Sequence, residues 1–217
     1  MDFLPEPLPT SPLPIFEQWY REARELRAQP NPDAMVLASV SNEGRPSARV
    51  VLCKRIDVAA GYIVFFTNYE SRKGREFQGN PHAAAVFHWD SAHRQVRVEG
   101  QIERSPADES DMYFASRALD SRVGAWASRQ SQPLASRAAL AEQVRQAALR
   151  FGIEQDTTAG TVPRPPHWGG FRLWLDRVEL WMEGPNRIHD RAVWIRTLES
   201  NGTSFSAGSW SATRLNP

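Results

Sequence analysis

The sequence predicts a mainly β protein in which one antiparallel β-barrel or sheet is decorated by inserted helices. Short runs rich in β-branched and aromatic residues are separated by turn signals, and segments of helical spacing lie between them. The 217 residues, 41% hydrophobic and 24% charged, have the composition of a globular domain. No linker-like segment divides the chain, so we expect a single domain over residues 15–217.

An N-terminal arm is expected over residues 1–14, which contain five prolines. Proline removes a backbone donor and fixes φ, so this stretch is predicted to be an extended or flexible arm outside the core. Its start at Met1 and Asp2 is acidic, unlike the basic start of a signal peptide. Apolar residues at helical spacing then predict an amphipathic helix over residues 15–26, ended by a Pro-Asn-Pro-Asp cluster.

The β pattern begins with two strands around an Asn-Glu-Gly-Arg turn, which predict a hairpin, and a third strand that completes a meander. Later runs predict two strands joined by a short connection, two more around a Glu-Gly-Pro-Asn turn, and a final edge strand. The expected strands are residues 34–41, 47–54, 62–67, 83–89, 95–103, 171–182, 192–197 and 210–215.

Serines mark the starts of two expected helices. Ser71 is a candidate N-cap for a short helix over residues 71–77, whose first turn carries two adjacent cations. Ser136 is a candidate N-cap for a longer helix that runs to residue 151 and is expected to lie on the barrel or sheet. Residues 155–166, rich in threonine, glycine and proline, are expected to form a loop.

A further helix is expected to begin at Ser105, which is followed by a proline and two acids. We expect this helix to continue past Tyr113. Because Tyr113 and Arg117 are four residues apart, it would present both on one face.

Charge and cysteine content narrow the function classes. With 26 basic and 25 acidic residues the net charge is +1, so no global field would attract nucleic acid or a lipid surface. The only cysteine, Cys53, permits no intrachain disulfide and no thiolate zinc cage, which favours a reducing compartment such as the cytoplasm. The apolar runs are far shorter than the roughly 20 residues of a membrane helix. We therefore expect no membrane span and no export.

Several catalytic and nucleotide-binding motifs are absent from the sequence. It contains neither the dinucleotide motif Gly-x-Gly-x-x-Gly nor a P-loop. Gly-x-Ser-x-Gly and Ser-x-x-Lys are missing too, so nucleophilic acyl transfer has no signature. His88 and His93 are close in sequence but far from Cys53, and no metal site is expected.

Basic side chains and hydroxyls gather at the ends of expected elements, in residues 49–54, 71–73, 113–121 and 187–191. Each cluster alone could be a solvated face of salt bridges. A phosphate monoester, however, carries about −1.5 to −2 charges at pH 7 and suits two or three arginine or lysine donors with hydroxyls. The four clusters together predict a site for more than one phosphate. Both lysines of the chain, Lys54 and Lys73, lie within them.

The motifs as a set resemble the pyridoxamine 5'-phosphate oxidases, which are FMN-dependent enzymes with a split-barrel flavin-binding fold of antiparallel, Greek-key type. The similarity runs from about residue 15 to residue 217. The segments that carry it are Arg-Val-Val-Leu-Cys-Lys at 49–54, Phe-Phe-Thr-Asn-Tyr-Glu-Ser-Arg-Lys at 65–73, Arg-Gln-Val-Arg-Val-Glu-Gly at 94–100, residues 121–131, His-Trp-Gly-Gly at 167–170, and Asn-Arg-Ile-His-Asp-Arg at 186–191.

This resemblance implies a homodimer with FMN at the subunit interface. Arg72 and Lys73 lie at an expected helix start, where free amides and the helix dipole favour an anion. Gln130 and Ser131 would reach the flavin from the partner subunit. The implied FMN contacts are Arg49, Val50, Val51, Leu52, Cys53, Lys54, Phe66, Thr67, Arg72, Lys73, Gln95, Gln130, Ser131, Trp181 and Arg191.

The same resemblance implies oxidation of pyridoxamine 5'-phosphate or pyridoxine 5'-phosphate to pyridoxal 5'-phosphate, a reaction of vitamin B6 biosynthesis and salvage. Molecular oxygen would accept the electrons and leave as hydrogen peroxide, and the amine substrate would also release ammonia. Arg187 and His189, alternate residues of an expected extended segment, would cover the pyridine ring and serve as the catalytic pair. The implied substrate contacts are Lys54, Tyr113, Arg117, Ser121, Arg187, Ile188 and His189.

Three alternatives stay open from the sequence. A phenazine-forming oxidase would share the FMN motifs, a non-catalytic carrier would bind FMN or pyridoxal 5'-phosphate without turnover, and an arginine-rich nucleic-acid binder would show steeply salt-dependent binding. The chain also departs from the family pattern. Met182-Glu183-Gly184 replaces the usual Gln-Gly type of turn, and the arm lacks the Arg-x-x-Tyr lid.

Overall fold

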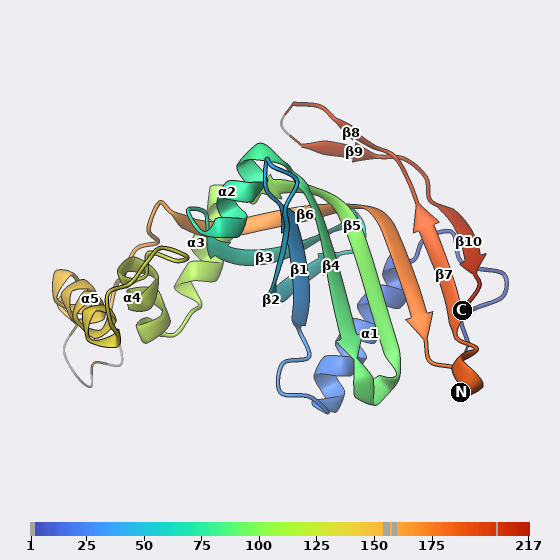
Figure 1. The fold of residues 1–217 in the computed structure, drawn as a ribbon, viewed down its shortest axis with the longest axis horizontal. Helices are drawn as coiled ribbons and strands as arrows, with labels where there is room; N and C mark the ends of the chain where they lie inside the picture. Colours follow the sequence, from blue (N-terminus) through green and yellow to red (C-terminus); the bar gives the residue numbers. More distant parts are fainter. Residues whose placement is uncertain (1–2, 154–156, 158–159, 203) are drawn as a thin grey trace.

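Six antiparallel strands close into a barrel in the computed structural model, which describes residues 3–153, 157, 160–202 and 204–217 (Figure 1). The strand order is β6-β3-β2-β1-β4-β5, and β5 pairs back onto β6 to close the ring. The expected hairpin, meander and later strands are therefore confirmed. The barrel strands are β1 (Ala34–Val40), β2 (Pro46–Asp57), β3 (Tyr62–Asn68), β4 (His82–Trp89), β5 (Arg94–Arg104) and β6 (Trp168–Met182).

Alternating side chains fill the barrel. Leu37, Phe65, Phe87 and Leu173 are fully buried, as expected where one face of each strand points inward. Helix α1 (Leu13–Leu26), which confirms the predicted amphipathic helix, closes one side, and the rings of its Phe16 and of Phe87 lie 5.1 Å apart. Burial of these aromatic and aliphatic side chains makes the barrel a rigid frame for the loops that it carries.

The sheet extends beyond the barrel through β7 (Asp190–Ile195), which pairs with β6, and β10 (Ser211–Leu215), which pairs with β7. The predicted C-terminal edge strand is thus confirmed. The short hairpin of β8 (Leu198–Ser200) and β9 (Phe205–Ala207) was not predicted, because its three-residue strands are too short for a periodic signal.

The N-terminal arm packs on the protein. Leu4, Pro12 and Leu13 are buried, so the prediction that residues 1–14 lie outside the core is wrong at these positions. The backbone N–H of Leu4 donates to Asp190, and the indole N–H of Trp194 donates to the carbonyl of Pro9. Apolar residues between the prolines supply the buried surface. Met1 and Asp2 lie outside the described residues.

Four helices flank the barrel at one end: α2 (Arg72–Gly79), α3 (Ala107–Ala115), α4 (Leu119–Ala127) and α5 (Arg137–Arg150) (Figure 1). The predicted caps Ser71 and Ser136 are confirmed, since their hydroxyls accept from the backbone N–H of Gly74 and Ala139. The predicted Ser105 cap is wrong, because α3 starts after Pro106 without a side-chain cap. Helix α4 was not predicted.

Helix α5 packs against α4 rather than against the barrel (Figure 1). Leu140 and Val144, two of the apolar residues at helical spacing, are 38% and 39% exposed, and Ala147 is the buried residue of the helix. The prediction that α5 lies on the barrel or sheet is therefore wrong.

Residues 157 and 160–166 contain no helix or strand, as expected for a loop, and the rest of 155–166 is not described. None of the helices in the described residues is both long and apolar enough to span a membrane.

Candidate functional site

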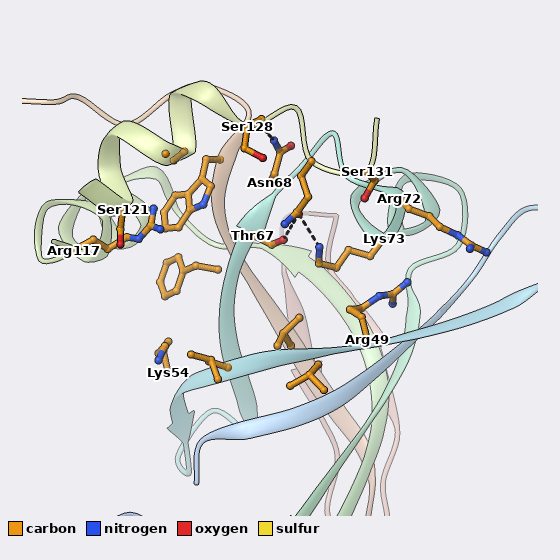
Figure 2. Close-up of a pocket in the computed structure, with 18 of the residues that line it drawn as sticks. Arg49, Lys54, Thr67, Asn68, Arg72, Lys73, Arg117, Ser121, Ser128 and Ser131 are labelled. Atoms are coloured by element: carbon orange, nitrogen blue, oxygen red, sulfur yellow. Dashed lines mark hydrogen bonds between the residues drawn. The ribbon is translucent and has the colours of Figure 1, made fainter. Parts of the chain in front are cut away.

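A cavity of about 830 Å³ opens between the outer side of the barrel and the helical end of the molecule (Figure 2). Strands β2 and β3, the start of α2, the α3–α4 segment and the loop after α4 surround it. Its volume lies in the range of cofactor sites. The lining comprises Ser47, Ala48, Arg49, Val50, Val51, Leu52, Lys54, Phe66, Thr67, Asn68, Arg72, Lys73, Tyr113, Arg117, Ser121, Gly124, Ala125, Ser128, Gln130, Ser131 and Trp168.

One end of the cavity is cationic. Arg49 comes from β2, and Arg72 and Lys73 come from the first turn of α2, where free backbone amides favour an anion (Figure 2). Lys73 is 7% exposed and donates to Ser71 Oγ at 3.1 Å. Burial, together with the positive charge of Arg49, lowers the pKa of Lys73 to about 8. This end has the donors and the charge that a phosphate dianion requires.

Gln130 joins the loop after α4 to this cationic end. Its Oε1 accepts from Lys73 Nζ at 3.0 Å and from Thr67 Oγ1 at 3.2 Å within the same chain. The structure therefore corrects the expectation that Gln130 and Ser131 reach the site from a partner subunit. The physical reason is the α4 helix, which ends at Ala127 and returns the chain over β3 and α2.

The opposite end of the cavity holds a second polar group that includes Lys54, Arg117 and Ser121 (Figure 2). Tyr113, which stacks on Phe66, lines the cavity as well. Tyr113 lies on α3, but Arg117 follows the end of that helix, so the prediction that both lie on one helical face is wrong. Both nevertheless line the cavity. Arg117 Nη1 is buried without a hydrogen-bond partner among the described residues, and burial lowers the pKa of Arg117. A buried guanidinium nitrogen without an acceptor points to an anionic ligand.

Aromatic rings connect the two ends. The Phe66 and Tyr113 rings stack at 3.9 Å with an interplanar angle of 13°, and the Trp168 ring lies parallel to Phe66 at 5.7 Å. The guanidinium carbon of Arg117 lies 4.7 Å from the centre of the Trp168 ring. Trp168 was not among the predicted site residues, although the His-Trp-Gly-Gly segment that contains it was one of the motifs.

The other predicted site residues lie elsewhere. Gln95, Trp181 and Arg191 are register neighbours on β5, β6 and β7. Arg187 and His189 line a second cavity of about 570 Å³, and the His189 ring lies 4.6 Å from that of Trp181. Within the described part of the chain, the large cavity is not lined by Arg187 or His189, and the second cavity is not lined by Arg49 or Lys54.

Three details of the prediction need correction. The Arg187 segment is a 3₁₀ turn, η2 (Pro185–Arg187), with positive φ at Asn186 and Arg187, rather than an extended segment. Ile188 is 68% exposed and does not line the second cavity. Cys53 points into the barrel core and is absent from the cavity lining, because strand alternation directs it away from its neighbours Leu52 and Lys54.

Comparison with known protein families matches residues 21–151 to the family model described as pyridoxamine 5'-phosphate oxidase. This model covers more than half of the chain. The chain belongs to the pyridoxamine 5'-phosphate oxidase family. Residues 168–217 match the pyridoxine 5'-phosphate oxidase C-terminal dimerisation region, which contains Trp181, Arg187, His189 and Arg191. Membership and the closed barrel together confirm the predicted split-barrel fold.

Curated relatives in the family are similar over nearly the whole chain. A pyridoxine/pyridoxamine 5'-phosphate oxidase of Burkholderia lata is 47% identical over 206 residues, 95% of this chain and 89% of the relative. One from Burkholderia mallei is 48% identical with the same coverage. The family and these relatives support an oxidase.

Two solved structures share the fold. PhzG from Burkholderia lata, in complex with tetrahydrophenazine-1-carboxylic acid, has a TM-score of 0.79 and 28% identity, and the alignment covers 96% of this chain and 94% of PhzG. A pyridoxamine 5'-phosphate oxidase-related, FMN-binding protein of Nostoc punctiforme has a TM-score of 0.68 at 15% identity, covering 95% of this chain and 98% of that protein. The fold is therefore shared with a protein whose structure holds a different small molecule, tetrahydrophenazine-1-carboxylic acid.

Proposed function

We propose that this protein oxidises pyridoxamine 5'-phosphate or pyridoxine 5'-phosphate to pyridoxal 5'-phosphate, with FMN as cofactor and O2 as electron acceptor. The observation that carries the proposal is the presence of two separate cationic groups at opposite ends of one cavity. One group suits the phosphate of FMN and the other suits the phosphate of the substrate. The curated relatives at 47–48% identity support the same assignment.

The residues at the α2 end fit the phosphate of FMN. Arg49, Arg72 and Lys73 provide charged donors, and the N-terminus of α2 adds free amides. Val50, Val51 and Phe66 supply apolar surface beside them for a flat ring system. When bound, FMN would accept two electrons from the substrate and pass them to O2, which is chemistry that side chains alone do not supply.

The residues at the other end fit the phosphate of the substrate. Arg117 Nη1 has no acceptor among the described residues, and Tyr113 and Ser121 add hydroxyls beside it. Lys54 Nζ lies 2.7 Å from Asp33 Oδ2, so a phosphate would compete with this carboxylate for the lysine. Charge-assisted hydrogen bonds from these residues would offset the lost hydration of a phosphate.

We further propose that the residues outside the large cavity complete the site from the partner subunit. They are Gln95, Trp181, Arg187, His189 and Arg191. Arg187 and His189 lie in a different cavity from Lys54 within one chain, and the dimerisation region that contains them supports a homodimer. Val36, Val50 and Leu52 on β1 and β2 are 45%, 65% and 38% exposed, which suits an apolar contact surface. Arg187 and His189 would then hold the ring that carries the reacting carbon against the flavin.

The decisive experiment is anaerobic reduction. The purified protein is expected to be yellow and to bleach when pyridoxamine 5'-phosphate is added without oxygen; readmitted oxygen should restore the colour and release peroxide. A yellow protein that stays oxidised with both B6 phosphates would contradict the substrate assignment but not the flavin.

A phenazine-forming oxidase is the second candidate, favoured by the similarity to PhzG. The same anaerobic experiment with tetrahydrophenazine-1-carboxylic acid separates the two candidates. That compound has a carboxylate but no phosphate, so the paired phosphate sites would give it no advantage. Faster bleaching by it than by pyridoxamine 5'-phosphate would favour the second candidate.

A further inference from the structure

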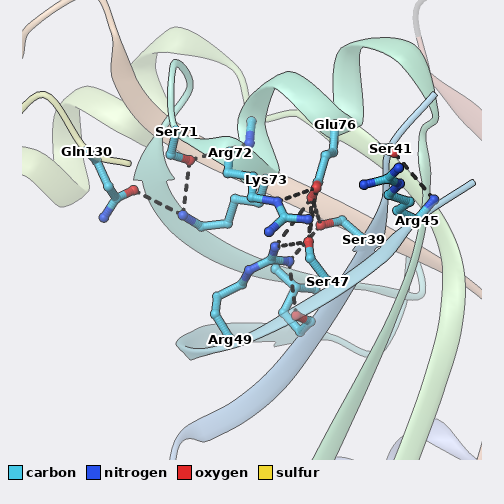
Figure 3. A network of polar contacts seen from close by, with 12 residues as sticks. Ser39, Ser41, Arg45, Ser47, Arg49, Ser71, Arg72, Lys73, Glu76 and Gln130 are labelled. Carbon is cyan, nitrogen blue, oxygen red and sulfur yellow. Dashed lines mark hydrogen bonds and ion pairs between the residues drawn. The ribbon is translucent and has the colours of Figure 1, made fainter. Parts of the chain in front are cut away.

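Glu76, on the second turn of α2, is a buried carboxylate that was not among the predicted site residues. It is 6% exposed and does not line the large cavity. Four side chains from three elements nevertheless converge on it (Figure 3). They are Ser39 from β1, Ser47 and Arg49 from β2, and Arg72 from α2 itself.

The contacts use both carboxylate oxygens. Oε1 accepts from Arg72 Nε at 2.9 Å, and Oε2 accepts from Ser39 Oγ at 2.5 Å and from Arg49 Nη2 at 3.3 Å. Ser47 Oγ lies 3.0 Å and 2.8 Å from the two oxygens. Burial raises the pKa of Glu76, but these hydrogen bonds outweigh it and lower the pKa to about 2, so the group stays ionised.

Arg49 is held from both sides. Besides Glu76, its Nη1 donates to the carbonyl of Leu37 at 3.1 Å and to Ser39 Oγ at 2.6 Å, and its Nη2 donates to Ser47 Oγ at 2.5 Å. Arg72 is held through Nε, and the structure gives its Nη1 and Nη2 no partner among the described residues. The carboxylate therefore fixes each guanidinium while leaving Arg72 with free amino groups at the cavity.

Charge balance points the same way. Arg49, Arg72 and Lys73 bring three positive charges into a small, partly buried space, where burial and the charge of Arg49 lower the pKa of Lys73. Glu76 reduces the local charge to +2, which is close to the magnitude of about 1.5 to 2 carried by a phosphate monoester at pH 7.

We propose that Glu76 is a positioning residue for the flavin phosphate. It holds the Arg49 and Arg72 guanidinium groups in place before the ligand arrives. It also reduces the local positive charge to about the magnitude of the charge on a phosphate dianion. The inference rests on the proposed FMN site. It predicts a defect confined to the phosphate, because Glu76 itself does not reach the cavity. A residue that only supports the fold would affect every flavin alike.

The test compares FMN with riboflavin, which lacks the phosphate. Flavin is removed from the purified protein, and binding of each flavin is followed by fluorescence quenching for the wild type and for Glu76→Gln. We expect the dissociation constant for FMN to rise about 10- to 100-fold in the variant, while that for riboflavin changes by less than about twofold. Arg72 and Arg49 donate to different oxygens of Glu76, and glutamine replaces one of these oxygens with an NH2 donor and removes the charge, which is why the loss should be large.

Glu109→Gln is the matched control. Glu109 is a partly buried carboxylate that is likewise shared by two arginines, Arg55 and Arg172, but it does not line the cavity. This control should leave both flavin affinities unchanged. If Glu76→Gln does not fold, Ser39→Ala removes the hydroxyl that bridges Glu76 and Arg49, and should weaken FMN about 3- to 10-fold without affecting riboflavin.

Equal losses for FMN and riboflavin would overturn the inference, because they would show a structural role. Unchanged or tighter FMN binding in the variants would overturn it as well. A wild-type protein that binds FMN no better than riboflavin would instead contradict the phosphate anchor of the proposed function, and this inference with it.

Discussion

The guanidinium group of Arg117 lies over the Trp168 ring, with its central carbon 4.7 Å from the ring centre, while its Nη1 is buried without an acceptor among the described residues. The indole thus holds the arginine in the cavity and leaves a charged donor for a ligand. Trp168 also lies parallel to Tyr113, whose ring centre is 6.2 Å away. One aromatic side chain therefore orients two of the proposed contacts to the substrate phosphate.

Replacement of Trp168 by leucine is expected to raise KM for pyridoxamine 5'-phosphate about 2- to 30-fold, the range of a partly desolvated cation–π interaction. Steady-state peroxide release gives KM and kcat. Trp126→Leu is the control, since Trp126 contacts Arg150 at 4.4 Å and does not line the cavity. An unchanged KM in Trp168→Leu would show that Arg117 does not need the indole.

Lys54→Ala and Arg187→Ala are each expected to abolish most activity, yet a mixture of the two should recover part of it. If each site takes Lys54 from one subunit and Arg187 from the other, a heterodimer contains one intact site. Statistical mixing would then restore about a quarter of wild-type activity. The measurement is peroxide release after co-expression of the two variants with different affinity tags. No recovery in isolated heterodimers would place both residues in the site of one chain.

The affinity for FMN is expected to fall as the pH rises above about 8. The pKa of Lys73 is lowered to about 8 by burial and Arg49, and a bound phosphate favours the charged lysine. Above this pH, binding must take up a proton, so the affinity falls by up to about tenfold per pH unit. Lys73→Arg stays charged and should remove the dependence. The measurement is an FMN titration at a series of pH values between about 6.5 and about 9.5, which lie on both sides of the pKa of Lys73 in the folded protein.

Gly100→Ala is expected to destabilise the barrel by about 3 kcal/mol or more, which is the upper range for overpacking. Gly100 lies at the register shift where β5 closes onto β6, and an added Cβ would lie 1.7 Å from the carbonyl oxygen of Trp174. Gly124→Ala is the control, since an added Cβ meets nothing within 4 Å and helix α4 should gain about 0.5 to 1 kcal/mol. Chemical denaturation measures both, and equal stabilities would contradict the prediction.

The strands and two helix caps could be predicted from the sequence because their signals are local. Turn residues bound each barrel strand, and Ser71 and Ser136 cap helices that lie directly after them in the chain. Helix α5 shows the limit of this reasoning. Its apolar spacing identified a helix, but spacing does not specify a packing partner, and Leu140 and Val144 remain exposed beside α4.

The site was predicted as a set of residues but not as an arrangement. Strand pairing places Gln95, Trp181 and Arg191 side by side and away from Arg49. The sequence near each residue does not specify which residue of the neighbouring strand it pairs with. Gln130 was assigned to the wrong subunit for the same reason, since its position depends on the unpredicted helix α4. Trp168 was missed because a tryptophan in a motif is equally compatible with a core residue.

The inward direction of Cys53 has a practical consequence. Its side chain is fully buried, and burial raises the pKa of the thiol to about 12, so reagents that attack thiolates will not modify the folded protein. Because Cys53 is the only cysteine, a new one placed on the surface can carry a spectroscopic label without background. Distances between labels on two copies would then report directly how the subunits are arranged.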